Sequence, residues 1–263
     1  MSDFLEKNPW NALRKFTNAR IALGRAGNSL PTAPLLAFNL SHAQARDAVH
    51  HPLDADVLHE QLRTHGFATL DVHSAAPDRE HYLRRPDLGR RLSEESREAL
   101  RQVTLEPPEV IFVIADGLSA FAASKQSIPL LNAVCSRLTD WTIGPVVVAR
   151  QARVALGDEI GEILKTKLVV MLIGERPGLS SPDSLGIYLT YAPKVGCSDA
   201  QRNCISNVRP EGLNYDAAAH KLHYLLTHAR RLGLTGVGLK DDSDALLGHA
   251  EPEAAEIPAP PSD

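Results

Sequence analysis

The second half of the chain contains three unbroken apolar runs, and each run ends abruptly in polar residues. They are VIFVIADG (110–117), GPVVVAR (144–150) and KLVVMLIGE (167–175). Apolar runs of this length without alternation are typical of strands that are buried on both faces. Helical patterns lie between them, over 120–138 and 158–165. Strands that alternate with helices at this spacing predict a parallel, doubly wound sheet.

One more strand and one more helix follow these runs. LGIYLTYAP (185–193) predicts a strand, and AAAHKLHYLLTHARRLG (217–233) predicts a long helix. From Lys240 onward the residues are mainly Asp, Glu, Ala and Pro, with few large apolar side chains. Because such a composition buries little apolar surface, it predicts a disordered tail over 240–263.

The first hundred residues have a different pattern, in which helices and connectors predominate. The pattern predicts a helix starting near Pro9, further helices over 35–49, 54–64 and 93–103, and a short strand over 67–72. The pattern changes at Pro107-Pro108, after which long apolar runs begin. We therefore predict an α/β protein: a smaller, mainly helical N-terminal domain, 1–107, followed by a Rossmann-like domain with a mostly parallel sheet, 108–239.

Charge and composition exclude several classes of partner. The net charge of −4 gives no electrostatic basis for binding nucleic acid or an anionic membrane. No apolar run reaches transmembrane length, and the N-terminus lacks the apolar segment of a secretory signal. Cys135, Cys197 and Cys204 form no C-x-x-C pair, so neither a zinc site nor a disulfide framework is expected. These features predict a cytoplasmic protein without a metal site of its own.

Three polar stretches follow the apolar runs, over 116–119, 150–154 and 175–178. In open parallel sheets ligands bind at the carboxyl ends of the strands, so we expect these stretches to converge on one site. No G-x-G-x-x-G or G-x-x-x-x-G-K-[ST] follows any of the strands. Their absence disfavours a dinucleotide-dependent oxidoreductase and a phosphate-loop site.

The stretch GERPG at 174–178 suits a neutral ligand better than a phosphate. Glu175 would repel a phosphate, but it would accept hydrogen bonds from a ligand that offers amide donors. Gly178 would allow the backbone to approach that ligand closely. The alternatives are a solvated turn, or an ion pair of Glu175 with Arg176 or Arg150.

Several short blocks give the chain a specific resemblance. In order along the chain they are GRRL (89–92), DGLS (116–119), DEIGEIL (158–164), GERPGL (174–179) and CISN (204–207). The chain resembles the small (light) chain of ethanolamine ammonia-lyase, in which these blocks occur in the same order. YLRRPDLGRRL (82–92) is also similar to that family, and the match covers roughly residues 10 to 235. Consecutive blocks in order are far more specific than any single motif.

The resemblance implies a subunit of an adenosylcobalamin-dependent lyase that converts ethanolamine to acetaldehyde and ammonia. It implies that a large chain, a TIM-barrel protein, binds ethanolamine and carries the radical chemistry, while the small chain closes over the cobalamin. The expected assembly is a hexamer of heterodimers, with the N-terminal domain of this chain docked on the large subunit. No catalytic residue is expected in this chain, and the cobalt is expected to keep its own dimethylbenzimidazole base.

The resemblance also implies cofactor-binding residues. The family's cobalamin contacts fall on Val154, Glu175 and Cys204, and we expect the Val154 contact to come from its backbone amide. Neighbouring residues of the same stretches are further candidates: Asp116, Ser119, Arg153, Arg176 and Gly178. Packing would equally explain Val154 and Cys204, and Asp116 and Ser119 are as compatible with capping the next helix as with touching a ligand.

Two further alternatives concern function and cobalt ligation. The chain could be a free-standing carrier or sensor for a corrinoid or nucleotide. Residues 71–76, DVHSAA, nearly match the D-x-H-x-x-G signature of proteins that ligate cobalt through His. The final Gly is Ala76, Pro77 follows, and no buried parallel strand is expected before it, so His73 is predicted to be a surface histidine.

The family resemblance leaves the cellular location open. Some family members carry a long N-terminal extension that can address the enzyme to a bacterial microcompartment. The matching region here begins almost directly after Met1. The cytoplasm is therefore the first expectation and the microcompartment the second.

Overall fold

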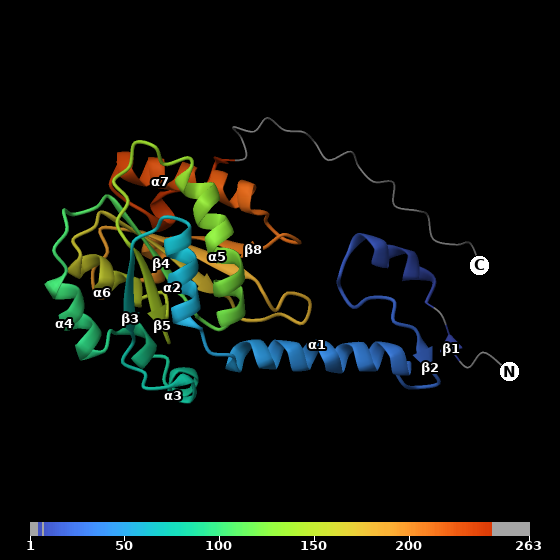
Figure 1. Ribbon diagram of the computed structural model, residues 1–263. Coiled ribbons are helices and arrows are strands. Elements are labelled where there is room, and N and C mark those ends of the chain that lie inside the picture. The colour runs from blue at the N-terminus through green and yellow to red at the C-terminus, as the bar shows by residue number, and fades with distance from the viewer. Residues whose placement is uncertain (1–4, 7, 244–263) are drawn as a thin grey trace.

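A six-stranded mixed sheet forms the centre of the molecule in the computed structural model, which describes residues 5–6 and 8–243 (Figure 1). Its strands are β3 (Thr69–His73), β4 (Val110–Ala115), β5 (Val146–Arg150), β6 (Leu168–Gly174), β7 (Leu185–Tyr191) and β8 (Arg202–Val208). Their order across the sheet is β3-β5-β4-β6-β7-β8. The first four strands in this order are parallel, and β7 and β8 are antiparallel to their neighbours.

Seven α-helices lie within the described residues. They are α1 (Thr32–His50), α2 (Ala55–Thr64), α3 (Arg79–Arg84), α4 (Glu94–Gln102), α5 (Ala120–Cys135), α6 (Leu156–Ile163) and α7 (Tyr215–Leu232). Short 3-10 helices are η1 (Pro9–Phe16), η2 (Leu88–Arg90), η3 (Asp199–Gln201) and η4 (Gly236–Gly238), and a small ribbon joins β1 (Leu5–Glu6) to β2 (Arg25–Ala26).

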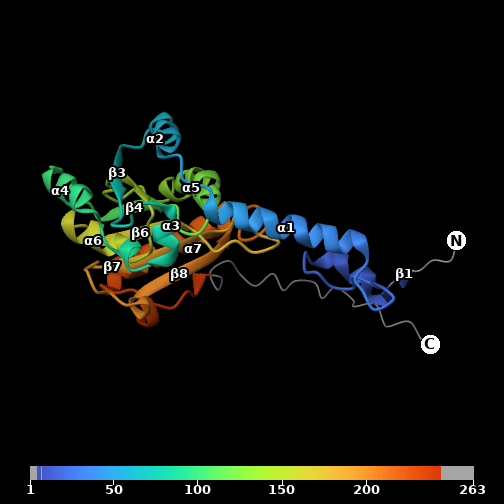
Figure 2. The ribbon, with the colours of Figure 1, turned by 90° about the horizontal axis from the view of Figure 1, so that it is seen from below.

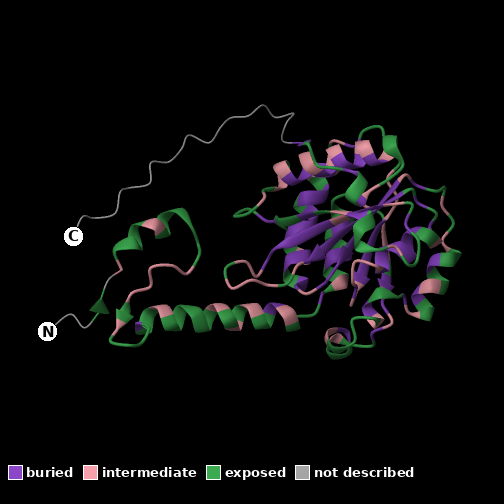
Figure 3. Ribbon diagram, turned by 180° about the vertical axis from the view of Figure 1, so that it is seen from behind, coloured by how far each residue is buried: buried purple, intermediate pink, exposed green. Residues whose placement is uncertain are grey.

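The central strands are apolar on both faces because helices cover both faces. Phe112 and Ile114 of β4 pack in one core with α2, α5 and α7. Ile111 and Val113, which point the other way, pack in a second core with α4 and α6. Figure 3 shows the buried residues concentrated in the sheet and in the helix faces that cover it. Each fully buried Val, Leu or Ile contributes about 1.5–3 kcal/mol relative to exposure.

The expected elements of the second half are confirmed as elements, but two strand directions differ from a purely parallel sheet. The segment between β6 and β7, 175–184, contains no helix. A parallel return needs a long crossover, so this short connection brings β7 back antiparallel. β8 was not predicted, because RNCISNV lacks an apolar run and buries only Arg202, Ile205 and Val208, every third residue. The mixed α/β class is thus established, whereas a Rossmann-like classification stays a prediction.

The sheet extends across the expected domain boundary at Pro107-Pro108. β3, which corresponds to the strand predicted over 67–72, pairs in parallel with β5 from Thr69↔Val146 to His73↔Arg150. α2, earlier still in the chain, packs in the same core as α5. The division into domains 1–107 and 108–239 stays a prediction, and β3 and α2 lie before the expected boundary but pack with elements that follow it.

Differences at the two ends of the chain have local causes. The helix expected from Pro9 is the 3-10 helix η1, whose N-cap is the Asn8 side chain. α1 projects from the sheet body, and Ala48 is its one buried residue (Figures 1 and 2). Of the predicted tail, Asp241 and Ser243 bond to each other and Ser243 is buried, while 244–263 lie outside the described residues. None of the described helices is long and apolar enough to cross a membrane.

Candidate functional site

A cavity of about 450 Å3 opens where β4, β5 and β6 end. The three polar stretches predicted from the sequence meet here, as expected for the carboxyl edge of parallel strands. Four of the candidate residues line the cavity: Arg153, Val154, Glu175 and Arg176. Two tyrosines that sequence reasoning missed, Tyr82 and Tyr188, also line it.

Glu175 lies directly after β6, and one of its carboxylate oxygens is held by the protein. Oε2 accepts hydrogen bonds from the Ser184 hydroxyl and from the Asn207 N–H, the latter at 3.2 Å. Oε1 has no partner in the described part of the chain. It lies 3.1 Å from where a Cβ of residue 186 would stand, so Gly186 in β7 leaves room for this side chain. The site therefore presents a fixed carboxylate with one oxygen available to a ligand.

The alternative ion pair of Glu175 is wrong. The Arg150 guanidinium binds Asp71 instead, with Nη2 and Oδ2 2.6 Å apart. Arg176 is exposed and forms no ion pair with any residue that the structure describes. Among the described residues Glu175 thus has no cationic partner, and its carboxylate is held by neutral donors.

The turn after β5 is shaped by a buried carboxylate. Asp116 accepts hydrogen bonds from the N–H groups of Gln151 and Ala152, each at 2.9 Å. Gln151 has a positive φ of 54°, a conformation that costs a non-glycine residue free energy unless its surroundings hold it. The next N–H along, that of Arg153, donates to the Gly89 carbonyl at 2.8 Å. The Val154 N–H has no acceptor among the described residues, so it is available to donate to a ligand.

Asp116 supports the site from inside the protein. Its side chain is 1 % exposed, and Arg79 Nη1 lies 3.1 Å from Oδ2. Burial raises the pKa of Asp116, while Arg79 and the N–H groups of Ala152 and Gln151 act in the opposite direction. Asp116 does not line the cavity, so its role in the structure is to hold the turn that carries Val154.

Ser119 is a helix cap in the structure. Its buried hydroxyl accepts from the Ala122 N–H at 3.2 Å and donates to the Pro182 carbonyl at 2.9 Å. It thereby begins α5 and ties the loop after Glu175 to that helix. Of the two interpretations that the sequence left open for Ser119, capping is the one its contacts show.

Tyr82 forms a rigid floor beside Arg153. Its hydroxyl donates to the Ala152 carbonyl at 3.1 Å, and the guanidinium carbons of Arg79 and Arg153 lie 4.8 and 4.4 Å from its ring centroid. Burial raises the pKa of Tyr82, and the charge of Asp116 adds to that effect. A Cβ on Gly89 would stand 2.9 Å from this ring. The sequence signal for this contact was the block YLRRPDLGRRL, which contains both Tyr82 and Gly89.

Cys204 lies one strand away from the cavity wall. It is exposed on β8 and pairs in register with Tyr188, a lining residue on β7. Burial raises the pKa of Tyr188, and the neighbouring Cys204 raises it further. Gly178 lies outside the lining, in a turn closed by reciprocal backbone bonds with Ser181 at 3.1 and 3.2 Å. Cys204 is therefore adjacent to the cavity, whereas Gly178 shapes the loop beyond Glu175.

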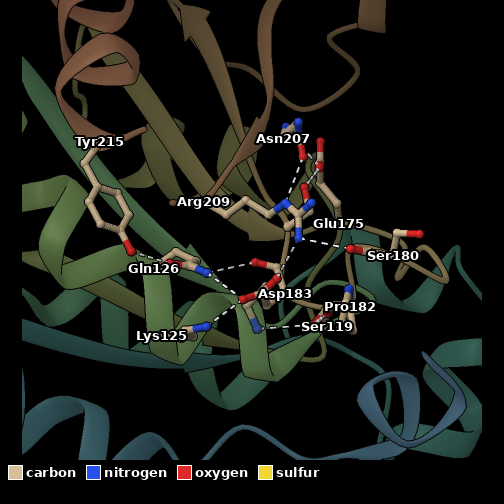
Figure 4. A network of polar contacts seen from close by, with 12 residues as sticks. Ser119, Lys125, Gln126, Glu175, Ser180, Pro182, Asp183, Asn207, Arg209 and Tyr215 are labelled. Atoms are coloured by element: carbon tan, nitrogen blue, oxygen red, sulfur yellow. Dashed lines mark hydrogen bonds and ion pairs between the residues drawn. The ribbon is translucent and has the colours of Figure 1, made fainter. Parts of the chain in front are cut away.

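A second network, centred on the carboxylate of Asp183, holds the loop 175–184 between β6 and β7 (Figure 4). Asp183 accepts from Lys125 Nζ at 2.7 Å, from Gln126 Nε2 at 3.2 Å and from Arg209 Nη1 at 3.3 Å. Burial opposes ionisation of Asp183, but the hydrogen bond and charge of Lys125, joined by those of Arg209, lower its pKa overall. Ser184 directly follows Asp183, so the contacts of Asp183 also help to position the Ser184 hydroxyl that donates to Glu175.

His73 ends a strand that is parallel but mostly not buried, so the expectation that no buried parallel strand precedes it stands. β3 is parallel to β5, although it is an edge strand and only partly buried. His73 Nδ1 lies 2.6 Å from the Ser74 carbonyl oxygen. Asp71 binds Arg150 and approaches His59 Nε2 at 3.4 Å, so its contacts do not include His73. Within the described residues no group of three or more His, Cys, Asp or Glu side chains is placed to hold a metal ion.

Comparison with known proteins agrees with these features. The family model of the ethanolamine ammonia-lyase light chain matches residues 7–240. The chain belongs to this family. It is 56 % identical over 246 residues to the ethanolamine ammonia-lyase small subunit of Ralstonia nicotianae, covering 92 % of this chain and 91 % of that protein. The small subunits of Pseudomonas putida strain GB-1 and Azotobacter vinelandii are 54 and 55 % identical, covering 95 and 90 % of this chain and 93 and 90 % of theirs.

Membership of the light-chain family confirms the resemblance found in the short blocks. Three of those blocks contribute to the cavity of this light-chain family member: DGLS through the turn after β4, GERPGL through Glu175, and GRRL through Gly89 beneath Tyr82. CISN lies in β8 beside the wall. The fifth block, DEIGEIL, forms most of α6, which packs on one face of the sheet. Four of the five blocks that identify the family therefore lie at or beside the cavity.

Proposed function

We propose that this chain is the small subunit of ethanolamine ammonia-lyase and that its cavity forms one wall of an adenosylcobalamin site. One observation carries the proposal. In a chain of this family, a carboxylate with one oxygen available and a backbone N–H without an acceptor among the described residues line the same cavity. Neither Glu175 Oε1 nor the Val154 N–H has a partner in the part of the chain that the structure describes, and both residues line one cavity.

The donor and acceptor set suits the rim of a corrin, which carries primary amides. An amide N–H₂ would donate to Glu175 Oε1, and an amide carbonyl would accept from the Val154 N–H. Cys204 would contact the same rim from β8. A cavity of about 450 Å3 is too small to enclose a cobalamin, so the macrocycle would lie across its mouth. Its other face would then be left for the large subunit to cover.

The chemistry proposed for this chain is binding and shielding. Adenosylcobalamin supplies the radical that starts the conversion of ethanolamine to acetaldehyde and ammonia. Glu175 and Val154 hold and orient the corrin, and the cavity wall excludes water from one side of it. Ethanolamine binds in the large subunit, the cobalt keeps its own base, and no residue of this chain is catalytic.

The N-terminal arm, residues 8–50, is proposed to dock on the large subunit. Leu36 and Leu40 on α1 are 62 and 60 % exposed, and Phe16 of η1 is 59 % exposed. So much exposed apolar surface on a projecting element indicates an interaction face. The arm is tied to the cofactor loop, because Arg20 Nη2 donates to the Leu179 carbonyl at 3.3 Å. A partner seated over the cavity would therefore meet the arm as well, in an assembly proposed to be a hexamer of heterodimers.

The deciding experiment is co-expression of this chain with the candidate large chain. Adenosylcobalamin-dependent formation of acetaldehyde from ethanolamine is expected from the complex and not from either chain alone. Turnover by this chain alone would contradict the proposal. Tight corrinoid binding by this chain without any large partner would instead favour a free-standing carrier. Location, in the cytoplasm or in a microcompartment, stays a prediction.

A further inference from the structure

Three arginines around the cavity carry charge that no ion pair within the described residues neutralises. Arg153 lines the main cavity and also an adjoining cavity of about 440 Å3, to which Arg90 contributes. Arg176 lines the main cavity. None of the three makes an ion pair within the described ranges. By contrast, the nearby Arg202, which lines the adjoining cavity, is paired with Asp158 at 2.6 Å.

The acidic groups on the same walls do not balance these charges. Asp158 is engaged with Arg202, and the fully exposed Asp199 lies 3.5 Å from Arg202 Nε. Glu175 is the other carboxylate of the lining, and its Oε2 is held by Ser184 and Asn207. The joined cavities therefore keep an excess of positive charge, which favours an anionic group in a ligand.

Arg153 is fixed at the junction of the two cavities. Its guanidinium carbon lies 4.4 Å from the Tyr82 ring centroid, and its backbone N–H is bonded to Gly89. A stacked guanidinium with unpaired donors is preorganised for phosphate, since its planar fork matches two phosphate oxygens.

We propose that Arg153, assisted by Arg90 and Arg176, binds the phosphodiester in the nucleotide loop of the cobalamin. This inference rests on the proposed function. The amides of the corrin rim are neutral, and the phosphodiester is the one anionic group of the cofactor. The neutral contacts at Glu175 and Val154 would position the ring, while the arginines would recognise the loop that distinguishes a complete cobalamin from an incomplete corrinoid.

The test measures binding to the assembled complex of this chain with its large subunit. Three probes are compared by equilibrium dialysis with absorbance detection: cyanocobalamin, cobinamide phosphate, and cobinamide, which lacks both phosphate and base. Arg153→Met is expected to weaken binding of the two phosphate-bearing probes roughly 10-fold or more, the range for a charged hydrogen bond. Binding of cobinamide should stay within about twofold of the unmodified complex.

Two further variants keep the result interpretable. Arg176→Met changes an exposed loop residue without ion-pair partners in the described chain, so folding is not at risk, and a smaller loss with the same probe selectivity is expected. Arg63→Met removes an exposed arginine of α2 that lies outside both cavities and makes no ion pair with the residues described. It should leave the binding of all three probes unchanged.

Several outcomes would overturn the inference. Equal weakening for all three probes would make Arg153 a structural support of the wall. Selective loss for cyanocobalamin alone would place the arginine against the base and not the phosphate. Unchanged binding together with loss of the large subunit would assign the arginines to an acidic surface of that partner. An unmodified complex that binds none of the probes would overturn the proposed function itself.

Discussion

At the scale of single residues, the site depends on a carboxylate held by neutral donors. Glu175 keeps its orientation through Ser184 and Asn207, and Gly186 leaves the space in which its side chain lies. No cation neutralises it within the described structure. Its negative charge is therefore available to strengthen a hydrogen bond from a ligand amide.

The first prediction concerns this charge. Glu175→Gln should weaken cobalamin binding by roughly 1.5–3 kcal/mol, the range for a hydrogen bond to a charged group. The substitution keeps the shape of the side chain but replaces an ionised acceptor with a weaker one. The measurement is the dissociation constant of cobalamin from the assembled complex, with Glu60→Gln on the exposed face of α2 as a control. Unchanged affinity would remove Glu175 from the binding site.

The second prediction concerns His73, the residue of the near-signature DVHSAA. His73→Ala should leave cofactor affinity and activity within about a factor of two. Ligation through histidine needs a second group that orients the ring, and Asp71 is committed to Arg150 instead. Electron paramagnetic resonance of the cob(II)alamin state with nitrogen-15 histidine gives the direct check. A change in the axial nitrogen coupling on labelling would put a protein histidine on the cobalt.

At the scale of elements, the loop 175–184 is a non-helical connection that is held in place by charge. Asp183 joins it to α5 through Lys125 and Gln126, and to the end of β8 through Arg209 (Figure 4). Tyr215 extends the network by donating to Gln126 Oε1 at 2.5 Å. The position of the loop, and therefore of Glu175, thus depends on how α5 and α7 pack.

The third prediction follows from the lowered pKa of Asp183. Asp183→Asn should destabilise the fold by about 1–3 kcal/mol at neutral pH, because Arg209 and Lys125 lose their acceptor. A folded pKa below the unfolded value of about 3.9 means that the stabilisation is complete above that pH. It is lost as the pH falls through the folded pKa.

Urea unfolding at several pH values checks this prediction. The difference in unfolding free energy between Asp183→Asn and the unmodified chain should be constant near neutrality and shrink below about pH 4. The exposed Asp56→Asn, in the first turn of α2, serves as a matched control. A difference that stayed constant down to pH 2 would show that Asp183 contributes by packing and not by charge.

At the scale of the whole molecule, the sheet body and the projecting arm differ in how far they bury their apolar side chains. The body buries its apolar residues in two cores on either side of the sheet. α1 buries one residue and exposes Leu35, Leu36, Phe38 and Leu40. Such a helix gains little from its own chain, so its burial is expected in the assembly.

The fourth prediction tests that arm. Leu36→Asp should reduce association with the large subunit by at least about 10-fold, since a buried charge at an interface lacks a partner. The stability of the isolated chain should change little, because Leu36 is exposed there. Co-purification and size-exclusion chromatography of the co-expressed chains give the measurement. Val237→Asp, at an exposed position on η4, is the control; an equal effect of both variants would argue against docking through the arm.

The apolar pattern alone determined strands β4, β5, β6 and β7 and helices α5, α6 and α7, and it predicted that three polar stretches meet at the strand ends. Val110–Ala115 and Leu168–Gly174 are buried at every position, and such runs have few alternatives to a central strand. The short ordered blocks determined the family. Each strand, helix and block is a local feature, so a single chain segment is enough to recognise it, and the order of the blocks can be read directly along the chain.

The tertiary structure decided what depends on residues far apart in the chain. Asp116 holds a turn 35 residues away, Asp183 meets Arg209 across 26 residues, and Tyr82 reaches Ala152 across 70. β8 and the edge strand β3 have no continuous apolar run, because each is buried at only some positions. Their places come from pairing with β7 and β5. Hydrogen bonds and strand pairing of this kind leave no periodic trace in the sequence, because each partner's residue type is common and only its position in space is specific.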